Sequence, residues 1–182
     1  IEDHTNLKLQ NIKETEDDIQ NKMYYLIVDY LKNNGYNHYE LSNFAKENYE
    51  SRHNLTYWNN DNYYGFGAGA SGFIDNIRYD NTKSVFKYNY GKTGVYEEKL
   101  SLNELMKDEV MLSLRKINGI NKNAFYKKYN VLLEDAFDYK KLIRNNFLTE
   151  TSKNVYINEN ELFVSNEIII MFLNSYLLEQ KR

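Results

Sequence analysis

The segment Tyr39–Gly72 constrains this chain more than any other part of its sequence. It begins with an alternating stretch, continues into the hexapeptide His53–Trp58 (HNLTYW) and ends in the run Gly65–Gly72 (GFGAGASG). Aromatic rings beside a histidine suit a buried planar ligand. Small residues alternating with glycine let a backbone approach a nucleotide-like cofactor closely. The segment therefore predicts a protein that binds ligands of these two kinds.

The chain has no cysteine among its 182 residues. This excludes disulfides, thiolate zinc sites and cysteine-ligated iron–sulfur clusters within it. Together with the ligand-type motifs, the absence predicts a piece of a metalloprotein whose metal-binding part lies outside this sequence. The chain starts at Ile1 with neither an initiator Met nor a signal peptide, which fits a piece that begins mid-chain. The lack of disulfides is compatible with the cytoplasm, where we expect the protein to work.

Composition predicts a folded core and no special class of partner. Hydrophobic residues make up 42% of the chain, enough to form a core. The net charge of −3 gives no general attraction to nucleic acid or acidic lipid. The longest apolar run, within Glu167–Leu173, is far shorter than a bilayer span, so we expect no transmembrane segment.

The first third of the chain predicts a helix, a turn and a strand. Glu14–Asn33 has helical periodicity, with Thr15 and Asp18 spaced as a capping box and Gly35 after its end. Residues 36–42 then alternate as a strand does. Helix, glycine turn and strand form half of an α/β repeat, which favours a parallel sheet or barrel. The apolar positions of the predicted helix are Ile19, Met23, Leu26, Ile27 and Tyr30.

The middle of the chain predicts less regular structure. Ser51–Trp58 is expected to form a short helical turn, and Tyr63–Ala70 a small-residue strand or loop. Asn76–Leu100 is polar and rich in tyrosine, and we expect it to be irregular. A domain boundary is predicted near residue 99, with residues 1–98 forming one domain and 99–182 the other.

The second half has a different order of elements. Helices are predicted over Leu102–Ile117, Lys122–Tyr129 and Leu133–Asn146. Val155–Ile157 and Leu162–Val164 are expected to pair as a hairpin, and Ser165–Leu178 to form a final helix. Three helices, a hairpin and a last helix are typical of a winged-helix-like module.

His53 is the strongest metal-ligand candidate of the three histidines. Imidazole binds iron or zinc through one nitrogen while the other is held by a neighbouring acceptor. Asn54 follows it, and Tyr57 and Trp58 offer flat apolar walls. The competing interpretation is a histidine at a helix start that packs among core aromatics, and the residues alone favour it. His4 and His38 have no supporting context.

The run from Gly65 to Gly72 is a second candidate site. Its central residues Gly67, Ala68, Gly69, Ala70 and Ser71 would leave backbone groups free to meet a ligand. It is no P-loop, because no Gly-Lys-Ser/Thr follows, and its glycine spacing differs from the dinucleotide fingerprint. Tight packing at a strand corner explains such glycines equally well. No catalytic residue is assigned from the sequence.

Three motifs in fixed order resemble the HemW-type family. They are Tyr39–Ala45, Glu50–Trp58 and Tyr64–Ala70, followed by a similar tail at Glu109–Gly119. Proteins of this kind are radical S-adenosylmethionine (SAM) proteins related to oxygen-independent coproporphyrinogen III oxidase. The resemblance covers essentially the whole chain and identifies it as a C-terminal portion. It implies the end of an incomplete (β/α) barrel followed by a winged-helix-like domain.

The resemblance also implies cofactors. The family carries a Cys-x3-Cys-x2-Cys site for a [4Fe–4S] cluster that SAM caps, and this chain has no such site. The loop matching Gly67–Ser71 borders the SAM pocket in the family. The motif His53, Asn54, Tyr57 and Trp58 is associated with heme binding, with His53 as the iron ligand. Ser71 stands where many relatives have histidine, so this chain would bind heme without that side chain.

The expected function is that of a heme chaperone that delivers heme to apoproteins. Such a protein would be cytoplasmic or at the inner face of the membrane, with no transmembrane segment. The alternative is oxidative decarboxylation of coproporphyrinogen III, which a cysteine-free chain could not perform alone. A nucleic-acid-binding winged helix is disfavoured, because acidic residues offset its lysines. An open sheet edge would also favour a homodimer.

Overall fold

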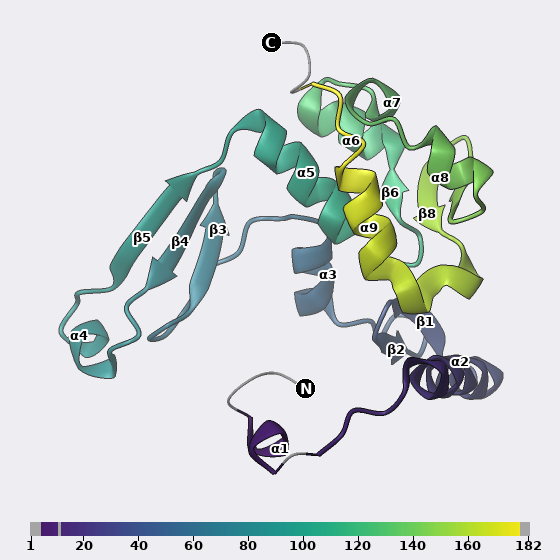
Figure 1. Ribbon diagram of the computed structural model, residues 1–182. Helices are drawn as coiled ribbons and strands as arrows, with labels where there is room; N and C mark the ends of the chain where they lie inside the picture. Colours follow the sequence, from purple (N-terminus) through teal and green to yellow (C-terminus); the bar gives the residue numbers. More distant parts are fainter. Residues whose placement is uncertain (1–4, 11, 179–182) are drawn as a thin grey trace.

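The protein is described by a computed structural model that covers residues 5–10 and 12–178. It has mixed α and β content, with a projecting three-stranded sheet on one side of a mainly helical body (Figure 1). Among the described residues, no helix is both long and apolar enough to cross a bilayer. The elements up to residue 99 are α1 (Asn6–Leu9), α2 (Asp17–Asn33), β1 (Asn37–Glu40), β2 (Asn43–Ala45), α3 (Arg52–Trp58), β3 (Ser71–Ile74), β4 (Ile77–Asn81), α4 (Val85–Asn89) and β5 (Gly94–Lys99). The elements that follow are α5 (Leu102–Ser113), β6 (Ile120–Asn121), α6 (Lys122–Tyr129), α7 (Leu133–Ala136), α8 (Lys140–Arg144), β7 (Leu148–Glu150), β8 (Asn154–Ile157), the 3-10 helix η1 (Glu159–Val164) and α9 (Ser165–Leu173).

Helix α2 begins three residues later than predicted, and its start lacks the predicted capping box. Glu16 is the N-cap, and no side chain caps the first turn. The acidic side chains in that turn favour the helix start through the helix dipole instead. The predicted stop is confirmed. Gly35 adopts a left-handed φ of 75°, and Tyr36 N–H donates to Leu31 O at 3.0 Å.

Strand β1 does not form a parallel pair among the described residues. It pairs antiparallel with β2, because the two residues between them are too few for a parallel crossover. The other side of β1 meets the chain after α5: Leu41 N–H donates to Arg115 O, and Ile117 N–H donates to Tyr39 O. The first part of the chain is thereby fastened to the C-terminal body.

The prediction that Asn76–Leu100 is irregular is wrong. This stretch forms β4, α4 and β5, and β4 is the centre of the antiparallel sheet β3-β4-β5. Asp75 and Asn76 have φ angles of 50° and 66° and make the tight turn between β3 and β4. Two left-handed residues suit the twist of a two-residue hairpin. Because the sheet is exposed over much of its surface, its strands carry few apolar residues that the sequence would flag.

Two predictions about the second half are also wrong. Val155–Ile157 pairs with β7 rather than with Leu162–Val164, which lies in the 3-10 helix η1. The predicted helix Leu133–Asn146 is split into α7 and α8, because Phe137 between them is extended. Helix α5 ends at Ser113, earlier than expected, and α9 ends at Leu173.

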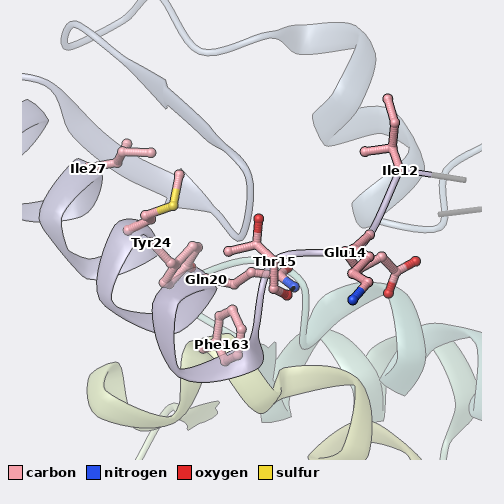
Figure 2. A pocket seen from close by; sticks show the side chains of 9 residues that line it. Ile12, Glu14, Thr15, Gln20, Tyr24, Ile27 and Phe163 are labelled. Carbon is pink, nitrogen blue, oxygen red and sulfur yellow. Dashed lines mark hydrogen bonds between the residues drawn. The ribbon is translucent and has the colours of Figure 1, made fainter. Parts of the chain in front are cut away.

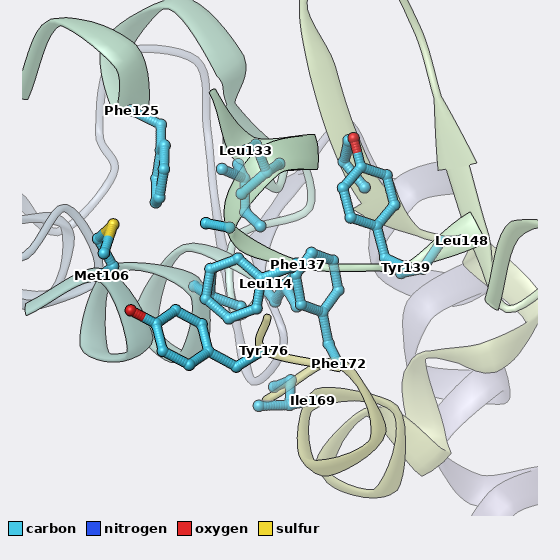
Figure 3. Packing of buried hydrophobic residues seen from close by; sticks show 14 of the residues in the cluster. Met106, Leu114, Phe125, Leu133, Phe137, Tyr139, Leu148, Ile169, Phe172 and Tyr176 are labelled. Atoms are coloured by element: carbon cyan, nitrogen blue, oxygen red, sulfur yellow. The ribbon is translucent and has the colours of Figure 1, made fainter. Parts of the chain in front are cut away.

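One hydrophobic core holds the body together. Its aromatic centre is Phe172, whose ring stacks on Tyr139 at 5.0 Å and meets Phe137 at 5.3 Å (Figure 3). Helix α5 contributes Met106 and Leu114 to the same cluster. Leu41 and Phe73 join this core from the first part of the chain. The core therefore fixes both the β1–β2 hairpin and the projecting sheet relative to α5.

Candidate functional site

The short helix α3 carries the His53 segment. Its N-cap is Ser51, whose side chain accepts a hydrogen bond from Asn54 N–H. Such a cap satisfies one of the donors that a helix start leaves free. Helix α3 lies against α5, so the core holds it in place (Figure 1). Asn54 is half-buried and takes part through its backbone.

His53 begins a line of aromatic rings that ends in the core. Its ring meets Tyr57 edge-on at 4.7 Å, one helical turn away. Tyr57 meets Tyr63 at 4.5 Å, and Tyr63 lies 6.5 Å from the buried Phe73. His53 is exposed, and within the described chain neither of its ring nitrogens forms a hydrogen bond. The imidazole is thus positioned by packing while its nitrogens are left open to a ligand.

Trp58 belongs to a different contact. The Arg115 guanidinium lies 5.4 Å from the centre of its ring, in cation–π geometry. Its Nε1–H is buried without a hydrogen-bond partner. The structure therefore brings Tyr57 to His53 and uses Trp58 to attach α3 to the end of α5.

The glycine loop is anchored by three side chains of the sheet and its tip. Tyr79 OH accepts from Gly65 N–H at 2.9 Å, and Tyr88 OH accepts from Gly67 N–H at 3.0 Å. The buried amide of Asn81 donates to the carbonyls of Gly65 and Gly67, both at 3.0 Å. These three anchors come from positions 14 to 21 residues further along the chain. The loop shape is therefore set by tertiary contacts.

Most donors of the candidate loop segment are used inside the chain. Gly69 N–H donates to Thr82 O, and Ala70 N–H to Gly67 O. The Ser71 hydroxyl donates to Asp80 at 2.6 Å, and Ala68 is half-buried. Gly67 and Gly69 have φ angles of 106° and 76°, which favour glycine. A ligand here would meet small side chains and carbonyls rather than a cradle of free N–H groups.

Two buried acids were missed as functional candidates. Glu40 is buried, accepts from Ser42 N–H with one carboxylate oxygen and leaves the other without a partner. Glu109 accepts from Lys128 at 2.7 Å and from the Tyr129 hydroxyl at 3.0 Å. Burial, together with the neighbouring Glu109 carboxylate, raises the pKa of Tyr129. The sequence held one signal for Glu109: it occupies a position on the apolar face of a helix, where a glutamate is unusual. Burial also lowers the pKa of Lys116, which with Glu109 lines a cavity of about 470 Å³.

His38 is buried in the β1–β2 hairpin. Its ring stacks on Phe44 at 4.3 Å, and its Nε2 lies 3.2 Å from Leu41 O. Burial lowers the pKa of His38 below its ordinary value of 6.5. No group of three metal-binding side chains occurs among residues 5–10 and 12–178.

A further cavity of about 660 Å³ lies beside α2 (Figure 2). Met23, Tyr24 and Ile27 of α2 form one wall, and Phe163 closes another. Gln20 and Thr15 also line the cavity, and the Gln20 side chain donates to Thr15 O at 2.6 Å. No sequence motif pointed to this cavity.

Comparison with known proteins shows which proteins this chain is similar to. Residues 100–164 match the HemN C-terminal domain. The heme chaperone HemW of Lactococcus lactis is 35% identical over 182 residues, covering 95% of this chain and 48% of the relative. That of Bacillus subtilis is 34% identical over 159 residues, covering 84% and 42%. The chain thus spans about half the length of the curated relatives it matches.

A solved structure shares the fold. It is described as "Coproporphyrinogen III oxidase (HemN) from Escherichia coli is a Radical SAM enzyme". The match has a TM-score of 0.61 at 15% identity and covers 80% of this chain and 39% of the other. Residues 100–164 therefore form a HemN C-terminal domain, and the chain is similar over most of its length to proteins named heme chaperone HemW.

Proposed function

We propose that this chain is the heme-binding part of a heme chaperone, which binds heme and passes it to apoproteins. The observation that carries the proposal is His53, an exposed imidazole with unbonded nitrogens held edge-on by Tyr57. Neutral imidazole is a strong ligand for heme iron. Relatives at 34–35% identity that are named heme chaperone HemW support the assignment.

Each residue of the segment has a proposed role toward heme, which is the cargo. His53 would bind the iron, and Tyr57 would lie against the porphyrin edge. Asn54 fixes the first turn of α3 through its bond to Ser51, and Trp58 fixes the last turn on Arg115. A single protein ligand and an open site suit a carrier, because cargo that must leave should not be enclosed.

The SAM-dependent chemistry of the radical family does not fit this chain alone. A [4Fe–4S] cluster needs cysteine thiolates, and the sequence has none. Residues Gly67–Ser71 are proposed to border SAM in the longer protein. Their glycines give close approach, although several of their N–H groups are already bonded. The alternative function is oxidative decarboxylation of coproporphyrinogen III, supported by the shared fold alone.

Domain organisation, location and partners are proposed on the same basis. We assign residues 1–98 to the end of an incomplete (β/α) barrel and residues 99–182 to a winged-helix-like domain. The protein is proposed to be cytoplasmic, with peripheral membrane association. A homodimer is also proposed, because α2 exposes an apolar stripe, and a sedimentation coefficient that stays constant with concentration would contradict it. The stripe consists of Ile19, Met23, Leu26, Ile27 and Tyr30.

A hemin titration followed by absorbance tests the heme proposal. The 182-residue chain should give a saturable Soret shift that His53→Ala abolishes, because the iron loses its protein ligand. Tyr57→Phe should retain the shift, since the ring contact survives. The matched control is His4→Ala, which removes a histidine outside the described residues and should bind as the parent does. A shift that persists unchanged in His53→Ala would overturn the assignment of this ligand.

A further inference from the structure

The connection between β4 and β5 forms a cationic, apolar tip on the sheet. We call residues 82–95 the β4–β5 tip. Figure 1 shows α4, its helix, at the outer end of the sheet, with α5 at the opposite end. The tip therefore reaches solvent without obstruction from the helical body.

The tip exposes hydrophobic side chains that a folded chain normally covers. Val85 and Val95 are each 65% exposed, Phe86 is 70% exposed and Tyr90 is 73% exposed. The rings of Phe86 and Tyr90 pack on each other at 4.6 Å. Singly exposed apolar residues are ordinary, but a contiguous group marks an interaction surface.

The charge of the tip is opposite to that of the whole chain. Lys83, Lys87 and Lys92 are exposed, and no acidic residue occurs between Asp80 and Glu97. Within the described part of the chain, none of the three lysines forms an ion pair. The local charge is thus +3 in a protein of net charge −3, so it is available to a negatively charged partner.

The tip is also held in a fixed conformation. Ser84 caps α4 by accepting from Lys87 N–H, and Thr82 N–H donates to Thr93 O at 2.7 Å. Tyr88 OH fastens α4 to Gly67 of the glycine loop. Phe66, the residue before Gly67, adds a further exposed ring. A surface that is already ordered loses little conformational entropy on binding.

We propose that the β4–β5 tip docks on the surface of an anionic lipid bilayer. Lysines attract acidic headgroups, while aromatic and valine side chains enter the interfacial layer. The apolar stripe of α2 does not fit this role, because its helix carries Asp17, Asp18 and Asp29 against two lysines. The inference rests on the peripheral membrane association proposed above and identifies the β4–β5 tip as the surface that makes it. Heme binding at His53 is independent of it.

Vesicle co-sedimentation of the 182-residue chain tests the inference. The chain should bind vesicles of phosphatidylcholine mixed with phosphatidylglycerol, and it should not bind phosphatidylcholine alone. High salt should release it, because salt shortens the reach of the headgroup charges. Charge reversal in Lys83→Glu/Lys87→Glu/Lys92→Glu should weaken binding roughly a hundredfold or more. Phe86→Ala/Tyr90→Ala should weaken binding about tenfold or more, because the inserted rings are lost.

Matched variants give the assay its controls. Lys127→Glu/Lys140→Glu/Lys153→Glu makes the same charge change on exposed lysines of the body and should keep most of the binding. Ile170→Ser removes an exposed apolar side chain from α9 and should bind as the parent does. The inference would be overturned if the two triple lysine variants lost vesicle binding equally, or if the parent did not bind anionic vesicles. Tip-dependent capture of a protein partner without lipid binding would overturn it as well. A hemin titration of Lys83→Glu/Lys87→Glu/Lys92→Glu distinguishes failure of the membrane inference from failure of the chaperone proposal. This variant should keep the Soret shift even though it no longer binds vesicles.

Discussion

At the scale of single residues, two histidines of this chain are in opposite environments. His53 stands exposed on α3 with its nitrogens unbonded, whereas His38 is buried in the β1–β2 hairpin against Phe44. Desolvation penalises the charged form of a buried imidazole. One histidine is therefore suited to meet a ligand, and the other to remain neutral within the fold.

The buried histidine predicts a pH dependence of stability. Burial lowers the folded pKa of His38, while the unfolded chain titrates near the ordinary 6.5. As the pH falls below 6.5, the unfolded state takes up the proton first, so the free energy of unfolding decreases until the folded pKa is reached. His38→Gln should reduce this loss in urea unfolding series at successive pH values.

Phe44→Leu is the control for that series, because it removes the stacked ring and keeps the imidazole. It should lower stability at all pH values but retain the pH-dependent part. An unchanged pH dependence in His38→Gln would assign the acid sensitivity to other groups, such as the carboxylates.

At the scale of elements, sequence reasoning succeeded where structure is local and failed where it depends on distant pairing. The end of α2 was predictable, because Asn34-Gly35 encodes a left-handed stop. The contact of His53 with Tyr57 follows from their spacing on one helix. The partners of β8, which are β6 and β7, were not predictable. Strand β7 and η1 carry similar apolar residues, and the pairing with β7 depends on the turn at 151–153.

The glycine loop shows the same limit within the candidate site. Its glycine content indicated a tight backbone, but nothing local indicates that Tyr79, Asn81 and Tyr88 hold it. Trp58 likewise pairs with Arg115, far along the chain. Those contacts arise only when β4, α4 and α5 are in place. The sequence therefore indicated the candidate segments, but it did not indicate the packing that positions them.

The packing of β3 on β4 gives a prediction for Gly72. A Cβ atom at this position would lie 2.1 Å from the Tyr79 ring, whose hydroxyl anchors Gly65. Gly72→Ala should therefore displace Tyr79, loosen the glycine loop and lower the free energy of unfolding by about 1–3 kcal/mol. Thermal or urea unfolding of the variant measures this loss.

Gly94→Ala is the matched control for Gly72→Ala. It lies in β5 of the same sheet, and a Cβ atom there would meet nothing within 4 Å. Its stability should stay within about 0.5 kcal/mol of the parent. Equal effects of the two substitutions would show that backbone entropy, and not the contact with Tyr79, decides the cost.

At the scale of the whole molecule, buried hydrophobic residues are distributed unevenly along the chain. Among the described residues before position 99, those in the buried hydrophobic core are Val28, Leu41, Ala45 and Phe73, and two of these pack into the C-terminal cluster. The residues from Leu100 onward contain the aromatic centre and nearly all of the remaining core. Because burial of apolar surface is the main source of stability, the two proposed domains should differ in their ability to fold alone.

Residues 99–182 should therefore fold alone, and residues 1–98 should not. Expressed separately, residues 99–182 should unfold cooperatively on heating. Their melting temperature should be lower than that of the whole chain, because the β1–β2 hairpin no longer bonds to Arg115 and Ile117. Residues 1–98 should lack a cooperative transition, because the sheet and α2 lose the surface they pack on. Circular dichroism melts of both pieces and the whole chain measure this. One continuous core requires a single unfolding transition in the whole chain. Two independent transitions would mean that Leu41 and Phe73 do not couple residues 1–98 to residues 99–182.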